Sequence, residues 1–287
     1  MSTSFGHKVR IFLEAIKFEH TIFALPFAFI SLLYAAEGIP EARVVGWILV
    51  AMVAARTAAM AFNRIADRDI DALNPRTQNR ALPAGLMTTH QMASALVIAI
   101  VVFLYAAWQL NWICFLLAPV VLGVILGYSY SKRFTPLAHY WLGLSLGIAP
   151  SAVWLAVRGT LEPAPVWLSL GVALWVAGFD ILYSLQDEAF DRAHGLCSLP
   201  QTLGAARAIV ISRISHALCI GAFLVGGRLL GAGGWYFAGV VFAGGMLAYE
   251  QSLVKPNDLS RLNTAFFTLN GYVSIGLLAF AILDKVF

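Results

Sequence analysis

Residues 63–85 read NRIADRDIDALNPRTQNRALPAG, a charged stretch that directly follows a long apolar run. Asn63, Asp67 and Asp71 lie four residues apart within it. Because steps of four advance the azimuth of a helix by only about 40°, we expect these three side chains to form one stripe. Two carboxylates and an amide make an oxygen-rich face. Such a face suits a hard cation such as Mg²⁺ that is shared with substrate phosphates.

The same stretch is rich in arginine. Its members are Arg64, Arg68, Arg76 and Arg80. Guanidinium groups offer planar forks to phosphate oxygens, so the stretch predicts a metal and phosphate site rather than a bare metal site. The alternative is a solvated helix end with internal ion pairs, which would be favoured in a soluble protein.

Composition places the chain among membrane proteins, because 60% of its 287 residues are hydrophobic and only 12% are charged. The mean hydropathy of +0.79 agrees with this class. Apolar stretches of about 20 residues, long enough to span a bilayer, occur at 20–38, 44–62, 90–109, 111–131, 137–157, 165–185, 207–229, 233–253 and 263–283. They predict an all-α integral membrane protein, a single domain over residues 1–287 folded as a bundle of nine transmembrane helices.

Positive charge predicts how such a bundle is oriented. With nine spans, one face carries 14 of the 19 lysines and arginines: Lys8, Arg10, Lys17, Arg64, Arg68, Arg76, Arg80, Lys132, Arg133, Arg192, Arg207, Arg213, Lys255 and Arg261. The positive-inside rule makes this face cytoplasmic, with the N-terminus inside and the C-terminus outside a bacterial inner membrane. Residues 1–19 alternate apolar and charged positions at helical spacing, which predicts an interfacial helix on that surface.

Arg56 lies inside the second predicted span, two helical turns before Asn63 and on nearly the same face. An arginine in a span is costly unless it faces the bundle interior or a wet cavity, which predicts a role in the site. A structural arginine that snorkels to the interface is the rival interpretation.

A second charged stretch, GFDILYSLQDEAFDRAHGLCSLP at 178–200, ends the sixth predicted span. Asp180, Tyr183, Asp187 and Asp191 fall on one face of a continuous helix. Asp180 lies inside the span, where carboxylates are rare and generally functional.

A basic pair, Lys132 and Arg133, follows the fourth predicted span beside Tyr128 and Tyr130. Alone, such a pair is a signal of topology. Its predicted position on the same membrane face as both aspartate stretches makes it a candidate for contact with phosphate.

Together these motifs resemble the UbiA superfamily of intramembrane aromatic prenyltransferases. The resemblance covers essentially the whole chain. It rests on Asn63-x-x-x-Asp67-x-x-x-Asp71, on Asn74-Pro75-Arg76-Thr77 with Arg80, and on Tyr183-x-x-x-Asp187-x-x-x-Asp191. It implies a polyprenyl diphosphate that binds through Mg²⁺ to Asp67, Asp71, Asp187 and Asp191, with its tail in a lipid-open tunnel and an active-site cavity open to the cytoplasm.

The chemistry of allylic transfer fits these residue types. Metal ions with arginine and lysine clamps stabilise charge on the leaving diphosphate, and helix walls exclude water from the allylic cation. The expected catalytic residues are Lys132 and Arg133 at the diphosphate and Asp180 or Asp191 as the proton acceptor. The expected substrate-binding residues are Asn63, Arg56, Arg68, Arg76, Arg80, Tyr128, Tyr130 and Tyr183.

The segment QDEAFDRAHGLCSLP at 186–200 is similar to the branch that contains 4-hydroxybenzoate polyprenyltransferases and the enzymes of futalosine-type menaquinone synthesis, slightly closer to the latter. The resemblance implies a small aromatic acid as acceptor, in ubiquinone or menaquinone biosynthesis, with membrane lipid around the protein and neither nucleic acid nor an obligate protein partner. Two alternatives remain. An ion-coupled transporter would place its charges near the membrane midplane, and a lipid-diphosphate phosphatase would need no aromatic acceptor.

Overall fold

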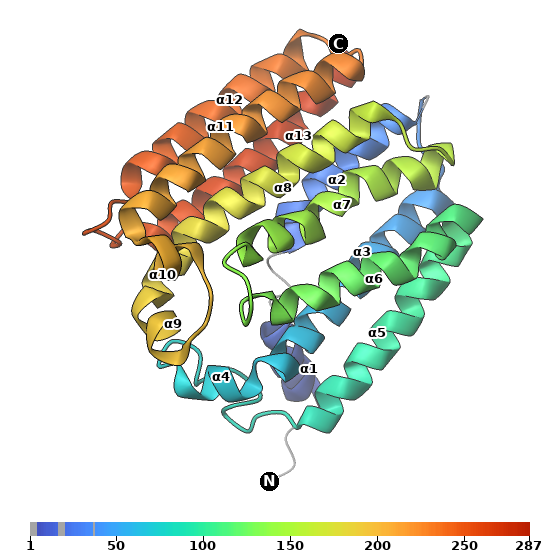
Figure 1. The fold of residues 1–287 in the computed structure, drawn as a ribbon. Coiled ribbons are helices and arrows are strands. Elements are labelled where there is room, and N and C mark those ends of the chain that lie inside the picture. Colours follow the sequence, from blue (N-terminus) through green and yellow to red (C-terminus); the bar gives the residue numbers. More distant parts are fainter. Residues whose placement is uncertain (1–4, 17–20, 37) are drawn as a thin grey trace. The chain divides into compact units, whose positions relative to one another are not determined.

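The structure is a computed structural model that describes residues 5–16, 21–36 and 38–287. Over these ranges the regular elements are helices, with no strand among them. The chain divides into two compact units, residues 1–21 with 45–130 and residues 22–44 with 131–287. Figure 1 shows the order of the helices along the chain.

The first unit contains α1 (Phe5–Ala15), most of α3 (Ala42–Ala66), α4 (Arg68–Leu73), α5 (Thr89–Leu110) and most of α6 (Trp112–Ser131). The second contains α2 (Thr21–Ala35), α7 (Ala138–Arg158), α8 (Pro163–Ser184), the 3₁₀ turn η2 (Leu185–Asp187), α9 (Glu188–His194), α10 (Leu199–Leu203), α11 (Ala205–Leu229), α12 (Gly234–Leu253), the π-helical turn η3 (Thr264–Leu269) and α13 (Asn270–Val286).

Each of the nine predicted spans overlaps a helix. Within the described ranges, seven helices are long and apolar enough to cross a membrane, at 42–66, 89–110, 112–131, 138–158, 163–194, 205–229 and 264–286. The other two predicted spans correspond to α2, which is only 15 residues long, and to α12. The count of nine spans therefore stays a prediction.

The predicted interfacial helix of residues 1–19 corresponds to α1 in its described part. Lys17, counted above for orientation, and His20, at the start of the first predicted span, lie outside the described residues. The last residues before that gap, Ala15 and Ile16, are buried. Ala15 packs with Ala61 and Met92 of the same unit, so α1 contacts protein at its C-terminal end.

In the first unit, α5 and α6 form an antiparallel hairpin, as their almost direct connection predicts. Asn111 makes this turn possible by serving both helices. Its backbone N–H donates to the carbonyl of Ala107, and its side-chain oxygen accepts a bond from the N–H of Cys114 at 2.8 Å. These bonds satisfy backbone groups at one helix end and at the next helix start.

In the second unit, α8 packs against both α7 and α11, and α12 packs against α11 and α13. Gly143 of α7 permits the first contact, since a Cβ atom there would collide with the backbone oxygen of Ala173 on α8. Buried polar side chains also join α8 to α11 through hydrogen bonds. Ser212 of α11 donates to the carbonyl of Gly178 at 2.7 Å and accepts from Gln251 at 2.7 Å, which fixes α8 just before Asp180.

Candidate active site

The first aspartate motif crosses a break between two helices. Asp67 separates α3 from α4. The N–H of Asp67 nevertheless donates to the carbonyl of Asn63 at 2.9 Å, and the N–H of Asp71 donates to the carbonyl of Asp67 at 2.7 Å. Because bonds between residues four apart are those of an α-helix, the motif keeps helical spacing across the break.

The side chains of this motif are buried and mutually oriented. Asp67 is 2% exposed and Asp71 is 4% exposed. The amide of Asn63 donates to Asp67 Oδ2 at 3.0 Å. Nη1 of Arg80 lies 2.8 Å from both carboxylate oxygens of Asp71. Buried carboxylates persist only with such partners, so Asn63 and Arg80 hold these two in place.

The Asn74-Pro75-Arg76-Thr77 motif is the turn that brings Arg80 back to Asp71. The side-chain oxygen of Asn74 accepts from the N–H of Arg76 at 2.9 Å, and the hydroxyl of Thr77 donates to the carbonyl of Asp71 at 3.0 Å. Asparagine commonly stabilises a turn in this way. Arg80 is predicted to bind substrate, and in the structure its guanidinium contacts Asp71, a metal-ligand candidate.

The position of Arg64 in the charged stretch suggests that its guanidinium contacts phosphate, but in the structure this side chain is buried and contacts protein. Only 4% of it is exposed. Its Nε donates to the carbonyl of Ala15 at 2.9 Å, and Nη1 donates to the side-chain oxygen of Asn63 at 3.4 Å. Arg64 therefore connects the C-terminal end of α1 to the residue that orients Asp67.

The remaining candidates of the first unit differ in exposure. Arg56 is half-buried on α3, and Arg76 is exposed. Arg68 is exposed and pairs with Asp69 at 2.9 Å. Tyr128 is half-buried, whereas Tyr130 is exposed and packs edge-on against Phe62 with ring centroids 5.7 Å apart.

The second aspartate motif departs from the predicted continuous helix. Leu185–Asp187 form a 3₁₀ turn between α8 and α9. A 3₁₀ turn rotates the chain by about 120° per residue instead of about 100°, so Asp187 and Asp191 do not continue the azimuth of Asp180 and Tyr183. Asp187 is the N-cap residue of α9 and Asp191 lies in its first turn, where negative charge is favourable.

The loop after α9 holds Asp191. Gly195 ends the helix with a left-handed φ of 65°, a conformation that glycine adopts without strain. The N–H of Leu196 donates to the carbonyl of Asp191 at 2.9 Å. Tyr183 stacks on Phe266 with ring centroids 4.1 Å apart.

Asp180 has a buried partner that sequence reasoning missed. Nδ1 of His139, at the start of α7, lies 2.7 Å from Asp180 Oδ2. The two residues are 41 apart in sequence, but they occupy the facing ends of consecutive spans. A polar residue at each of those ends was the signal that would have suggested the pair.

Lys132 and Arg133 follow α6 in the second unit. Arg133 is exposed and Lys132 is half-buried. The carbonyl of Lys132 accepts from the N–H of Cys197 at 2.6 Å, so the basic pair is anchored to the loop that also holds Asp191.

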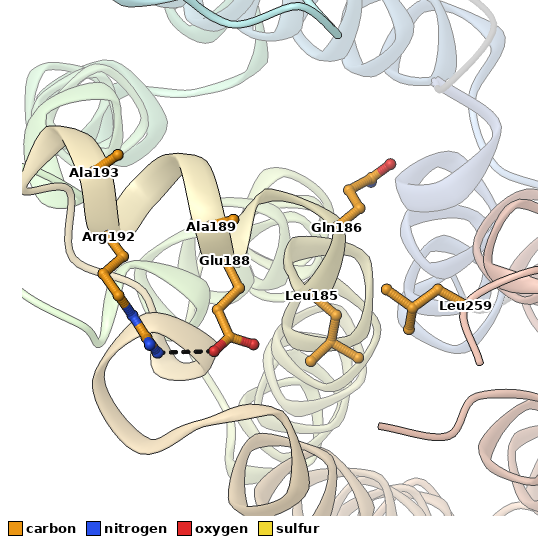
Figure 2. A pocket seen from close by; sticks show the side chains of 7 residues that line it. All are labelled: Leu185, Gln186, Glu188, Ala189, Arg192, Ala193 and Leu259. Carbon is orange, nitrogen blue, oxygen red and sulfur yellow. Dashed lines mark hydrogen bonds and ion pairs between the residues drawn. The ribbon is translucent and has the colours of Figure 1, made fainter. Parts of the chain in front are cut away.

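A pocket of about 590 Å³ lies beside the second motif (Figure 2). Its lining consists of Leu185, Gln186, Glu188, Ala189, Arg192, Ala193 and Leu259. Glu188 and Arg192 form an ion pair at 2.9 Å, drawn in Figure 2, which neutralises both charges. A largely apolar pocket with an internal ion pair does not have the chemistry of a diphosphate site, and Glu188 is engaged away from the metal-ligand candidates.

The carboxylates of the two motifs suit a Mg²⁺ ion that is also bound by the phosphates of a substrate. Among the described residues, no three His, Cys, Asp or Glu side chains are grouped for a metal ion. Mg²⁺ usually keeps several waters and takes one or two carboxylates together with substrate phosphates. The two carboxylates of each motif match that demand, whereas a dedicated protein cage for a metal is absent from the described part of the chain.

The profile of the UbiA prenyltransferase family matches residues 24–272. The chain belongs to this family. It is an integral membrane protein and an aromatic prenyltransferase, as the resemblance of its two aspartate motifs implied.

Two further similarities agree with the family. The 4-hydroxybenzoate octaprenyltransferase of Nitrosomonas europaea is 29% identical over 256 residues, which cover 88% of this chain and 86% of that protein. The apo structure of a UbiA homologue from Aeropyrum pernix K1 superposes with a TM-score of 0.84 and 34% identity, covering 93% of this chain and 98% of that one.

A more distant structure, a UbiA homologue from Archaeoglobus fulgidus bound to DMAPP and Mg²⁺, has a TM-score of 0.71 at 16% identity. It covers 96% of this chain and 99% of that one. At that identity the likeness establishes the common fold.

Proposed function

We propose that the protein transfers a polyprenyl group from a polyprenyl diphosphate to a ring carbon of a small aromatic acid, in ubiquinone or menaquinone biosynthesis. The observation that carries the proposal is the buried pair Asp67 and Asp71, held in place by Asn63 and Arg80 inside a family of prenyltransferases. The curated relatives that act on 4-hydroxybenzoate support an aromatic acid as the acceptor.

Asp67 and Asp71 of one motif and Asp187 and Asp191 of the other would hold Mg²⁺ together with the substrate diphosphate. Bound Mg²⁺ would neutralise charge on the oxygens of the leaving diphosphate. Arg80 orients the carboxylate of Asp71, and Asn63 orients that of Asp67. Homologues that bind DMAPP, GPP and Mg²⁺ support this cofactor.

Lys132 and Arg133 would contact the diphosphate as it leaves, since their charges suit phosphate oxygens. We assign further substrate contacts to Arg56, Arg68, Arg76, Tyr128, Tyr130 and Tyr183. Asp180 would accept the proton that the aromatic ring loses, because Asp191 is assigned to the metal. Apolar side chains around the bound prenyl chain would exclude water from the allylic cation.

The direct test incubates the purified protein with Mg²⁺, a labelled polyprenyl diphosphate and a panel that includes 4-hydroxybenzoate and a dihydroxynaphthoate. We expect a prenylated aromatic acid and free diphosphate in equal amounts. Release of inorganic phosphate and prenyl monophosphate, without prenylation of any acid, would instead indicate a phosphatase. No consumption of the diphosphate with any acid would contradict the proposal.

We further propose that the active site faces the cytoplasm of a bacterial inner membrane, with the N-terminus inside and the C-terminus outside. The proposal is supported by the excess of lysine and arginine on one predicted face. A cysteine introduced at position 78 should be protected from an impermeant thiol reagent added to intact cells, and one at position 232 should react. The reverse labelling pattern would overturn this orientation.

A further inference from the structure

His139 lies in the middle of a hydrogen-bonded chain. The backbone N–H of Leu199 donates to His139 Nε2 at 3.3 Å, and His139 Nδ1 lies 2.7 Å from Asp180 Oδ2. The side chain of His139 is 4% exposed and that of Asp180 is 20% exposed. The imidazole is therefore shielded, while the carboxylate keeps an accessible edge.

The chain fixes the tautomer of His139. A backbone N–H can only donate, so Nε2 of His139 must accept and carries no proton. The ring proton then resides on Nδ1, which donates to Asp180. A doubly protonated imidazolium would have to give up the bond from Leu199. His139 is thus a neutral donor that engages Oδ2, which points to the other carboxylate oxygen, Oδ1, as the atom that takes a proton.

Leu199, which donates to His139, begins α10 directly after a loop whose backbone anchors other parts of the second unit's site. The N–H of Leu196 bonds the backbone of Asp191, and the N–H of Cys197 bonds the backbone of Lys132 at 2.6 Å. The hydroxyl of Ser198 accepts from the N–H of Gln201 at 3.3 Å and so caps the start of α10. Through its contacts with Leu199 and Asp180, His139 connects this segment to the Asp180 carboxylate.

We propose that His139 is the positioning residue of Asp180, a role that rests on the function proposed above. The allylic C–O bond breaks and its electron pair leaves with the diphosphate, and a ring carbon of the acceptor forms the new carbon–carbon bond to the allylic carbon. The C–H bond at that ring carbon then breaks, its electron pair restores the aromatic ring, and the proton goes to Asp180 Oδ1. His139 gains and loses no proton in this step, because both of its nitrogens are already engaged. Its contribution is to fix the rotation of the carboxylate and to tie it to the segment 196–199.

The test compares His139→Phe, His139→Gln, Asp180→Asn and the double variant His139→Phe with Asp180→Asn. We expect His139→Phe to lower kcat by about 10-fold to 150-fold, the range for loss of a hydrogen bond to a charged group. The KM for polyprenyl diphosphate should stay unchanged, since Asp180 acts on the acceptor. His139→Gln should recover most of the activity, because an amide supplies one donor and one acceptor across a single carbon, as the imidazole does.

The double variant separates positioning from packing. If His139 acts through Asp180, adding His139→Phe to Asp180→Asn should lower kcat no further. His90→Phe, an exposed histidine at the start of α5, is the matched control and should retain wild-type kinetics. Thermal melting identifies any variant that fails to fold, and if His139→Phe fails, His139→Leu takes its place, alone and combined with Asp180→Asn.

Two results would overturn the role of His139 while leaving the proposed function intact. One is a full kcat in folded His139→Phe, and the other is a loss that adds fully to that of Asp180→Asn. Failure of the proposed function would look different, since the wild-type protein would then prenylate no acid in the panel.

Discussion

Replacing Asp67 or Asp187 with asparagine is expected to lower turnover on the order of 100-fold to 1,000-fold, the scale seen when one preorganised group at a developing charge is lost. Asparagine keeps the shape of aspartate but removes the charge that a substrate-shared Mg²⁺ requires. Since Mg²⁺ has only a few protein ligands, the loss of one carboxylate removes much of the negative charge that the protein places beside the ion. Initial rates at saturating Mg²⁺ and both substrates measure the effect.

Each motif offers a matched control. Asp69 is exposed, lies two positions from both Asp67 and Asp71, and pairs with Arg68. Glu188 lies next to Asp187 and pairs with Arg192. Asp69→Asn and Glu188→Gln should keep near wild-type rates and melting temperatures. Wild-type turnover in folded Asp67→Asn or Asp187→Asn would remove that motif from the metal site.

Neutralising Lys132 or Arg133 with alanine is expected to raise the KM for polyprenyl diphosphate, or to lower kcat, by about 10-fold to 150-fold. That range corresponds to roughly 1.5–3 kcal/mol for a lost charge-assisted hydrogen bond. The KM for the aromatic acid should change little. The measurement is steady-state kinetics with each substrate varied in turn, on protein verified to be correctly inserted.

Arg207→Ala is the control for this pair, since Arg207 is exposed and lies on the same predicted face. A basic pair that served only topology would give a different result. Yield and insertion would then fall while the correctly inserted fraction kept unchanged kinetics, and that result would leave diphosphate recognition to other cations such as Arg76.

Local patterns in the sequence predicted a large part of the fold. Apolar runs of about 20 residues are long enough to identify helices one by one, and each of the predicted spans overlaps a helix. The hairpin at Asn111 was predictable because so short a connection forces antiparallel neighbours. The span count was harder, because α2 is too short to meet the length of a full span on its own.

The finer features of the site depend on contacts that no local pattern encodes. Arg64 and Arg80 look alike in the sequence, but burial turns Arg64 toward Ala15 and the turn at Asn74 brings Arg80 to Asp71. The 3₁₀ turn at Leu185–Asp187 carries no glycine or proline that would predict it. His139 meets Asp180 only through the packing of α7 on α8.

The central claim is that both aspartate motifs bind one diphosphate through Mg²⁺. Its most direct test is equilibrium binding of an unreactive prenyl diphosphate analogue, without an aromatic acid, to the wild-type protein and to the Asp67→Asn and Asp187→Asn variants. We expect binding to the wild type in Mg²⁺, no binding in EDTA, and severe weakening in both variants. Binding that persists in EDTA, or that either variant retains at wild-type affinity, would contradict the account.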